Sequence, residues 1–75
     1  MIRNFRIKVI EGNSRFKYRE GRIVKIDIED IATCRSLVLR YLDDSCFVIF
    51  NIKEVIDDVE LRIIAEGQIY VLEKI

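Results

Sequence analysis

The amino-acid sequence predicts a small all-β fold, an antiparallel barrel or sandwich of about six strands with one short helical turn near 52–57. Apolar residues alternate with charged ones over several stretches, a period typical of strands that bury one face. Glycine-containing turn segments, EGNS and REG, separate the first three of these stretches. Proline is absent, which suits a chain whose backbone amides are mostly used in regular structure. A chain of 75 residues predicts one domain, 1–75.

The first third of the chain predicts a three-stranded meander, with strands over 5–10 (FRIKVI), 15–18 (RFKY) and 22–28 (RIVKIDI). A two-residue loop at 12–13 would place Val9 opposite Phe16. A three-residue loop that ends at Gly21, a residue that tolerates a left-handed backbone, would place Phe16 opposite Val24. Both registers keep the apolar side chains on one face, as a buried face requires.

A second hairpin is expected from SLVLRYL, the turn DDS and CFVIF. A two-residue loop at 43–44 would place Leu39 opposite Val48. The apolar residues between 30 and 42 also have helical spacing, so a helix over that segment is the alternative. The β-branched and aromatic residues that follow the turn favour the hairpin.

The sequence NIKE at 51–54 has the spacing of a capping box, which predicts the short helical turn near 52–57. A two-residue turn at 66–67 predicts a last hairpin with Ile63 opposite Tyr70. This set of short strands and one helical turn fits a small barrel of SH3-like or related build. Such a likeness concerns the fold and implies no activity.

Hydrophobic residues make up 51% of the chain, which is more than so short a domain easily buries. The expected strands of the second half carry apolar side chains on both faces, and a sheet of that kind is covered on both sides. The second face therefore either closes inside a barrel or binds a partner, most simply another copy of the chain as a symmetric dimer. The expected interface residues are Val38, Phe47, Ile49, Ile64, Ile69 and Val71.

Charge is divided along the chain although the total is zero. Residues 1–25 contain eight basic and two acidic residues, a net of +6, and residues 26–75 carry −6. The basic side chains of the expected first hairpin share its outer face, so phosphate, the chain's own acidic half or a neighbouring copy would offset their repulsion. The expected phosphate contacts are Arg6, Lys8, Arg15, Lys17 and Lys25. The aromatic rings would point to the opposite face, which disfavours binding of single-stranded nucleic acid by stacking.

The sequence contains no recognisable set of catalytic residues. Histidine is absent, so the serine and cysteine side chains lack the commonest activating base. The acidic pairs at 43–44 and 57–58 lie where turns are expected, and aspartate favours turns for local hydrogen-bonding reasons. The two cysteines, Cys34 and Cys46, are expected to be buried thiols rather than a disulfide framework. We expect no enzyme activity, no metal and no cofactor.

The N-terminal segment lacks an apolar core of signal-peptide length, and the longest apolar run, CFVIF, is too short to span a membrane. We therefore expect a cytoplasmic protein without membrane contact. The expected function is that of a non-enzymatic protein-binding or regulatory module that self-associates through the apolar sheet face. The alternative is a nucleic-acid-binding module that uses the basic face.

Overall fold

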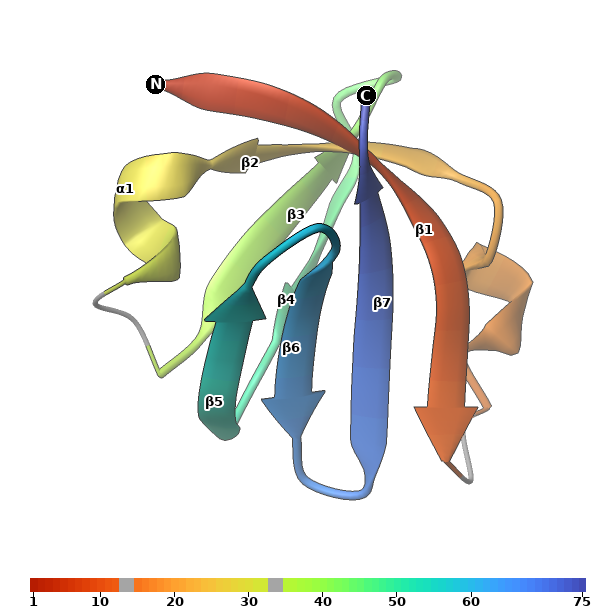
Figure 1. Cartoon of the computed structure of the whole chain (residues 1–75). Helices are drawn as coiled ribbons and strands as arrows, with labels where there is room; N and C mark the ends of the chain where they lie inside the picture. Colours follow the sequence, from red (N-terminus) through yellow and green to blue (C-terminus); the bar gives the residue numbers. More distant parts are fainter. Residues whose placement is uncertain (13–14, 33–34) are drawn as a thin grey trace.

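The computed structural model describes residues 1–12, 15–32 and 35–75 and confirms the all-β fold. Seven strands form one antiparallel sheet within this described part, together with a 3-10 turn and a four-residue helical turn (Figure 1). The strands are β1 (Ile2–Gly12), β2 (Ile23–Asp27), β3 (Leu37–Tyr41), β4 (Cys46–Ile49), β5 (Ile52–Asp57), β6 (Leu61–Ala65) and β7 (Gln68–Lys74). The 3-10 turn η1 spans Lys17–Arg19, and the helical turn α1 spans Ile28–Ile31.

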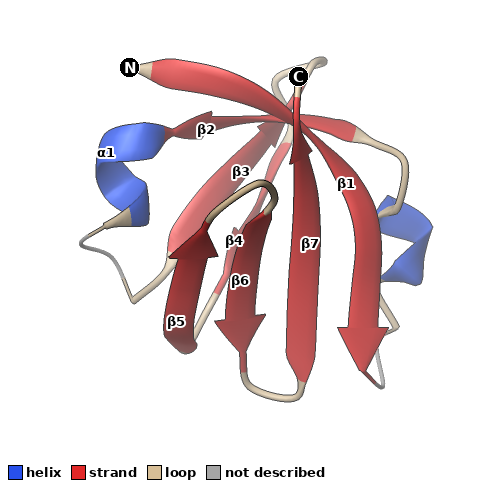
Figure 2. Cartoon of the chain, in the orientation of Figure 1, coloured by secondary structure: helices blue, strands red, loops and turns tan. Residues whose placement is uncertain are grey.

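The sheet curls around one core in the order β4-β3-β2-β1-β7-β6-β5. The long strand β1 pairs with β2 through its first half and with β7 through its second, as the pairs Arg6–Ile23 and Ile10–Tyr70 show. Two meanders, β2–β4 and β5–β7, are thereby joined by β1 and face each other (Figure 2). The sheet does not close, because β4 and β5 lie at its two ends.

The core fills the space between the two meanders. A bulge in β1 between Ile7 and Val9 breaks the strict alternation, so Ile10 is fully buried whereas Val9 is half-buried. The buried cluster takes side chains from six of the strands, and Ile52 and Val55 of β5 pack against its edge. Its members are Phe5, Ile7, Ile10, Val24, Ile26, Leu37, Leu39, Tyr41, Phe47, Ile49, Leu61, Ile63, Ala65, Tyr70 and Leu72.

The predicted strand over 15–18 is wrong, because this segment forms a turn and η1 while β1 pairs directly with β2. The carboxylate of Glu20 holds the segment in place by accepting a 2.8 Å hydrogen bond from the backbone amide of Ile10. The Gly21 amide donates to the Ile7 carbonyl at 2.7 Å. Gly21 does have the left-handed backbone expected for it, with φ of 86°.

The second hairpin is present as β3 and β4, and the helix considered over 30–42 is limited to α1. Its register differs from the prediction by one residue: Leu39 faces Phe47 rather than Val48. The reason is a three-residue loop in which Asp44 has φ of 70°, a conformation that aspartate tolerates. The shift turns Phe47 and Ile49 inward.

The predicted helical turn near 52–57 is also wrong, because these residues form β5. A capping residue needs an extended backbone, whereas Asn51 has φ of 55°. The next amide, that of Ile52, donates to the Arg35 carbonyl at 2.9 Å. Strand pairing with β6 then lets Ile52 and Val55 pack against the core. By contrast, the last hairpin is confirmed, with Ile63 opposite Tyr70 and Gly67 in the turn with φ of 73°.

Candidate functional site

The six residues of the predicted interface do not form one exposed face. Phe47 and Ile49 are 8% and 4% exposed and belong to the core, because the β3–β4 register differs from the predicted one. Val71 is only 6% exposed between its neighbours on β1 and β6. The prediction of an exposed apolar surface is therefore wrong for these three. Val38 is exposed, and Ile64 and Ile69 are half-buried.

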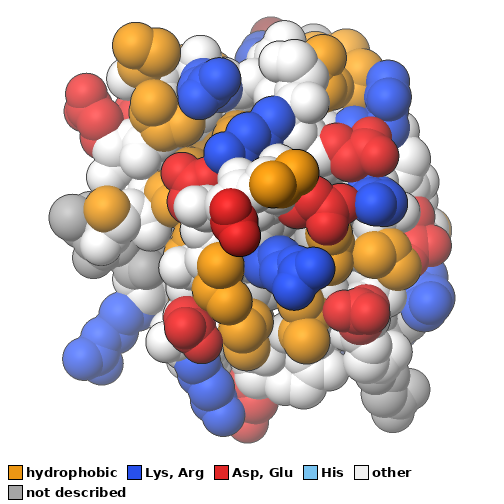
Figure 3. Space-filling view, in the orientation of Figure 1, with side chains coloured by type: hydrophobic (Ala, Val, Ile, Leu, Met, Phe, Trp, Pro, Cys, Tyr) orange, Lys and Arg blue, Asp and Glu red, His pale blue; other side chains and the backbone are white. Residues whose placement is uncertain are grey.

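The outer face of β5, β6, β7 and β1 has mixed character. Figure 3 shows hydrophobic side chains on this face in small separate groups, with charged side chains between them. Ile64 and Ile69 lie opposite each other at the end of this face near the β6–β7 turn. Such scattered exposure is ordinary for a protein surface and indicates no large apolar patch there.

Most of the predicted phosphate contacts are ion-paired within the chain. Arg6 lies 3.7 Å from Glu73, Lys8 lies 2.8 Å from Glu60, Lys25 lies 3.3 Å from Asp44, and Lys17 lies 4.0 Å from Glu20. Among the described residues, Arg15 has no carboxylate within ion-pair distance; its guanidinium lies 5.6 Å from the Phe16 ring centre. The acidic remainder of the chain therefore neutralises much of the basic segment, which was one of the expected ways to offset its repulsion.

The acidic pair at 43–44 lies in a turn, as expected, whereas Asp57 of the second pair is the last residue of β5. Asp43 accepts hydrogen bonds from the amide and hydroxyl of Ser45, and these bonds lower the pKa of the Asp43 carboxyl. Asp57 pairs with Lys74 at 2.7 Å, and the Lys74 ammonium also donates to the carbonyl oxygen of Asp58. Within residues 1–12, 15–32 and 35–75, no three acidic or cysteine side chains gather as metal ligands would.

The expectation of two buried thiols is wrong for Cys46, which is exposed, while Cys34 lies outside the described residues. Neither helical segment of the described chain has the length or hydropathy to cross a lipid bilayer.

Aromatic rings from three strands form a row at one end of the core. The ring centres of Tyr41 and Phe47 are 5.3 Å apart, and those of Phe47 and Tyr70 are 6.3 Å apart. The segment between β1 and β2 places two arginines on this row. The Arg19 guanidinium lies 3.8 Å from the Phe47 ring centre, and the Arg22 guanidinium lies 4.0 Å from that of Tyr41. These distances are those of strong cation–π contacts.

Arg19 contacts two aromatic rings and a tyrosine hydroxyl but has no acidic partner among the described residues. Its guanidinium lies 4.2 Å from the Phe16 ring centre and 3.8 Å from that of Phe47, and its Nη1 donates to the Tyr70 hydroxyl at 3.3 Å. Its Nε is buried without a hydrogen-bond acceptor. No carboxylate of the described residues forms an ion pair with Arg15, Arg19 or Arg22. A half-buried cation in this state has unused capacity to bind an anion.

Beside this arginine lies a groove with a volume of about 430 Å³, which we call the Arg19 groove. Its lining residues come from the end of β4, from the hairpin of β6 and β7, and from the segment that contains η1. The exposed ring of Phe50 stands at its rim. The lining residues are Phe16, Arg19, Phe47, Val48, Ile49, Phe50, Asn51, Ala65, Glu66, Gln68 and Tyr70.

Burial raises the pKa of the Tyr70 hydroxyl despite the nearby Arg19 charge, and burial likewise raises the pKa of Tyr41. Tyr70 is therefore protonated at neutral pH. It accepts from Arg19 and has its own hydrogen left to donate into the groove. Apolar and aromatic walls with a few convergent polar groups are typical of binding sites in the mouths of β-barrels.

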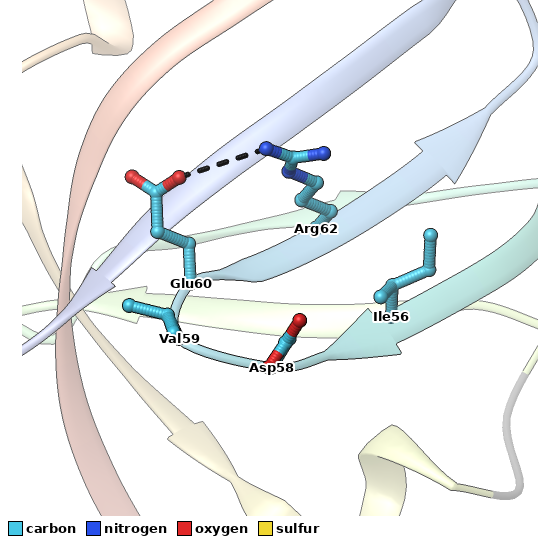
Figure 4. A pocket seen from close by; sticks show the side chains of 5 residues that line it. All are labelled: Ile56, Asp58, Val59, Glu60 and Arg62. Carbon is cyan, nitrogen blue, oxygen red and sulfur yellow. Dashed lines mark ion pairs between the residues drawn. The ribbon is translucent and has the colours of Figure 1, made fainter.

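A second hollow, at the β5–β6 turn, lacks these features. It measures about 120 Å³ and is lined by Ile56, Asp58, Val59, Glu60 and Arg62 (Figure 4). Glu60 is already paired with Lys8 at 2.8 Å and with Arg62 at 3.8 Å, and these partners lower the pKa of its carboxyl. The glutamate and the arginine of this hollow are therefore already paired with each other.

The sequence did not reveal the Arg19 groove, because its parts come from β4, β7 and a segment that was predicted as a strand. One local signal was present: basic residues and aromatic rings alternate from Arg15 to Arg19. On a strand that alternation separates rings from charges, but on η1 it brings them together.

The sequence matches no protein-family model, and neither curated proteins nor solved structures match the chain. Its function therefore has to be inferred from its own residues.

Proposed function

We propose that this chain is a non-enzymatic module that binds a segment of a partner protein in the Arg19 groove. The observation that carries the proposal is the half-buried Arg19 guanidinium, which lies over two rings, has no acidic partner among the described residues and lines the Arg19 groove. Aromatic and arginine side chains in such a setting are the residues that most often dominate binding energy at protein interfaces.

Several further features support a binding role over catalysis. The groove is lined by rings, aliphatic side chains and amides, with Glu66 as its one carboxylate. The chain contains no histidine to act as a base near it. Exposed Phe50 at the rim supplies a large apolar contact that the free monomer leaves in water.

A display library of random short peptides, selected on the folded protein, tests this proposal. Selected peptides should bind the wild type and lose at least about tenfold in affinity with Phe50→Asp, because the charge would be desolvated at the groove rim. Val59→Asp is the matched control, since Val59 is 85% exposed on the β5–β6 turn, far from the groove wall. A selection that yields only binders indifferent to Phe50→Asp contradicts the proposed site.

A second copy of the chain is one protein that would fit the predicted self-association. Sedimentation of the wild type at high concentration shows whether the partner is a second copy of the chain or a different protein. A monomer points to a different partner, whereas a dimer that Phe50→Asp converts to monomer identifies the second copy as the occupant of the groove.

Single-stranded nucleic acid is a second candidate function, favoured by one observation. Rings and unpaired arginines share one end of the molecule, rather than opposite faces as the sequence predicted. In that case binding of a labelled oligonucleotide would weaken steeply with salt, and Arg22→Met would lower the salt slope by about one. Absence of binding at low salt would remove this candidate.

A further inference from the structure

We infer that the partner binds as an added strand: an extended segment pairs with the free edge of β4 and places an aspartate or glutamate side chain on Arg19. This inference rests on the proposed function and specifies the conformation and the chemistry of the bound segment. Strand addition at a sheet edge is a general mode of peptide recognition in which main-chain bonds give affinity and side-chain pockets give specificity.

The lining of the groove shows that it follows the edge of β4. Successive side chains of a strand point to opposite faces, yet five consecutive residues, 47–51, all line the groove. The first three of these, Phe47, Val48 and Ile49, belong to β4, and a groove that touches consecutive residues of a strand runs along its edge rather than over one face. Within the described chain, β4 is paired only with β3, so its other edge has unpaired backbone groups.

The two edge strands of the sheet differ in how well their sequences prevent pairing with a strand of another molecule. The β5 edge carries Lys53, Glu54 and Asp57 and has a bulge near its start, which are the usual devices against unwanted pairing. The β4 edge, CFVI, has no charged residue, no proline and no bulge. Apart from its length of only four residues, the β4 edge has none of these protective devices, as is expected where another strand is meant to pair.

Charge favours an acidic segment. Most other basic side chains of the first third are paired with acids of the same chain, whereas Arg15, Arg19 and Arg22 are not. A planar guanidinium binds a carboxylate through two parallel hydrogen bonds, and contacts with the Phe16 and Phe47 rings restrict the movement of the Arg19 guanidinium. Main-chain pairing with β4 favours a peptide over a nucleic acid, because a nucleic acid has no strand backbone to offer.

The test uses a peptide obtained by the display selection above, made also as two N-methylated forms in which alternate amides are blocked. One form should lose at least about tenfold in affinity and the other should bind nearly as well, because only alternate amides of an added strand face β4. Changing the acidic residue of the peptide to its amide should also weaken binding about tenfold. That loss should disappear with Arg19→Met, in which no guanidinium is left to pair with it.

The outcomes separate this inference from the proposed function. Binding that depends on Phe50 but tolerates N-methylation at every position overturns strand addition and leaves the groove as the binding site. Binding that is equally strong with the amide peptide overturns the acidic partner. If no groove-dependent peptide is found, the proposed function and this inference both fail. The amide substitution needs no protein variant, so it stays decisive even where Arg19→Met lowers stability.

Discussion

Gly12 is the residue at which the backbone least tolerates a side chain. Its φ is 107°, and a Cβ atom there would collide with the carbonyl oxygen of Gly67 in the β6–β7 turn. Gly21 also has positive φ, of 86°, but a Cβ atom there would meet open space. These two positions therefore separate the cost of a close approach from the cost of backbone conformation.

We expect Gly12→Ala to lower the free energy of unfolding by about 2 kcal/mol or more and Gly21→Ala by about 1 kcal/mol. Denaturant unfolding of the two variants measures the difference. Equal losses would show that the β6–β7 turn does not approach Gly12 as closely as described.

Asp43 and Glu60 are two surface carboxyls whose lowered pKa values make the stability of the fold depend on pH. Hydrogen bonds from Ser45 lower the pKa of Asp43, and the hydrogen bond from Lys8 lowers the pKa of Glu60. A carboxyl whose folded-state pKa is depressed contributes stability above its ordinary pKa. That contribution is lost as pH falls through the folded-state pKa.

An NMR titration should therefore find the Asp43 carboxyl titrating below the ordinary aspartate range. Ser45→Ala should move its pKa upward, because the hydroxyl donor is removed. Glu60 in the same sample is the internal control: its partners differ from those of Asp43, so its pKa should not change in the Ser45→Ala variant. An ordinary pKa for Asp43 in the wild type would contradict the hydrogen bonds described at this turn.

At the scale of elements, the sequence predicts some hairpins better than others for identifiable reasons. The last hairpin was predicted in register because a Glu-Gly pair at 66–67 sets a two-residue loop. The β3–β4 register was missed because the loop length depends on whether Asp44 takes a left-handed backbone, which aspartate permits but does not require. The strand at β5 was missed because a capping pattern is local, whereas pairing with β6 is not.

The β3–β4 register is tested by a matched pair of variants. Phe47→Ala should cost about 3–5 kcal/mol, because it removes a buried ring, whereas Phe50→Ala should change stability by less than about 0.5 kcal/mol. Thermal or denaturant unfolding measures both. The reverse order would restore the register that the sequence predicts, with Phe50 inside.

The segment between β1 and β2 depends on Glu20, which accepts from the Ile10 amide. We expect Glu20→Ala to cost about 1–3 kcal/mol, since the amide loses a charged acceptor. It should also weaken peptide binding, because η1 positions Arg19. Glu11→Ala, at an exposed site on the same strand as Ile10, is the control and should do neither. An unchanged stability in Glu20→Ala would mean that this bond does not anchor η1.

At the scale of the whole molecule, the division of charge along the sequence becomes a set of contacts in space. Basic residues of β1 and β2 pair with acids of β7, of the β5–β6 turn and of the β3–β4 loop, as in Arg6–Glu73, Lys8–Glu60 and Lys25–Asp44. Each exposed pair contributes little on its own. Together they leave Arg19 and Arg22 as the basic groups without an ion pair beside the row of aromatic rings.

The Arg19 groove itself was beyond prediction from the sequence. Composition and period-two alternation indicate which residues are buried, and this was enough to predict the fold class. The groove requires Phe47, Tyr70 and Arg19 to converge from distant positions, and that convergence depends on the bulge in β1, the β3–β4 loop and the 3-10 turn. Each of these is a local irregularity that a regular pattern does not encode.

The central claim is that the Arg19 groove and the edge of β4 bind a partner segment. It is tested most directly by recording amide NMR spectra of the wild type while a display-selected peptide is added. The account predicts that resonances of Arg19, Phe47–Asn51 and the β6–β7 turn shift or broaden, while those of Val59 and its neighbours do not. Shifts confined to Ile64, Ile69 and the outer face of β6 and β7, with the Arg19 and β4 resonances unchanged, would contradict it.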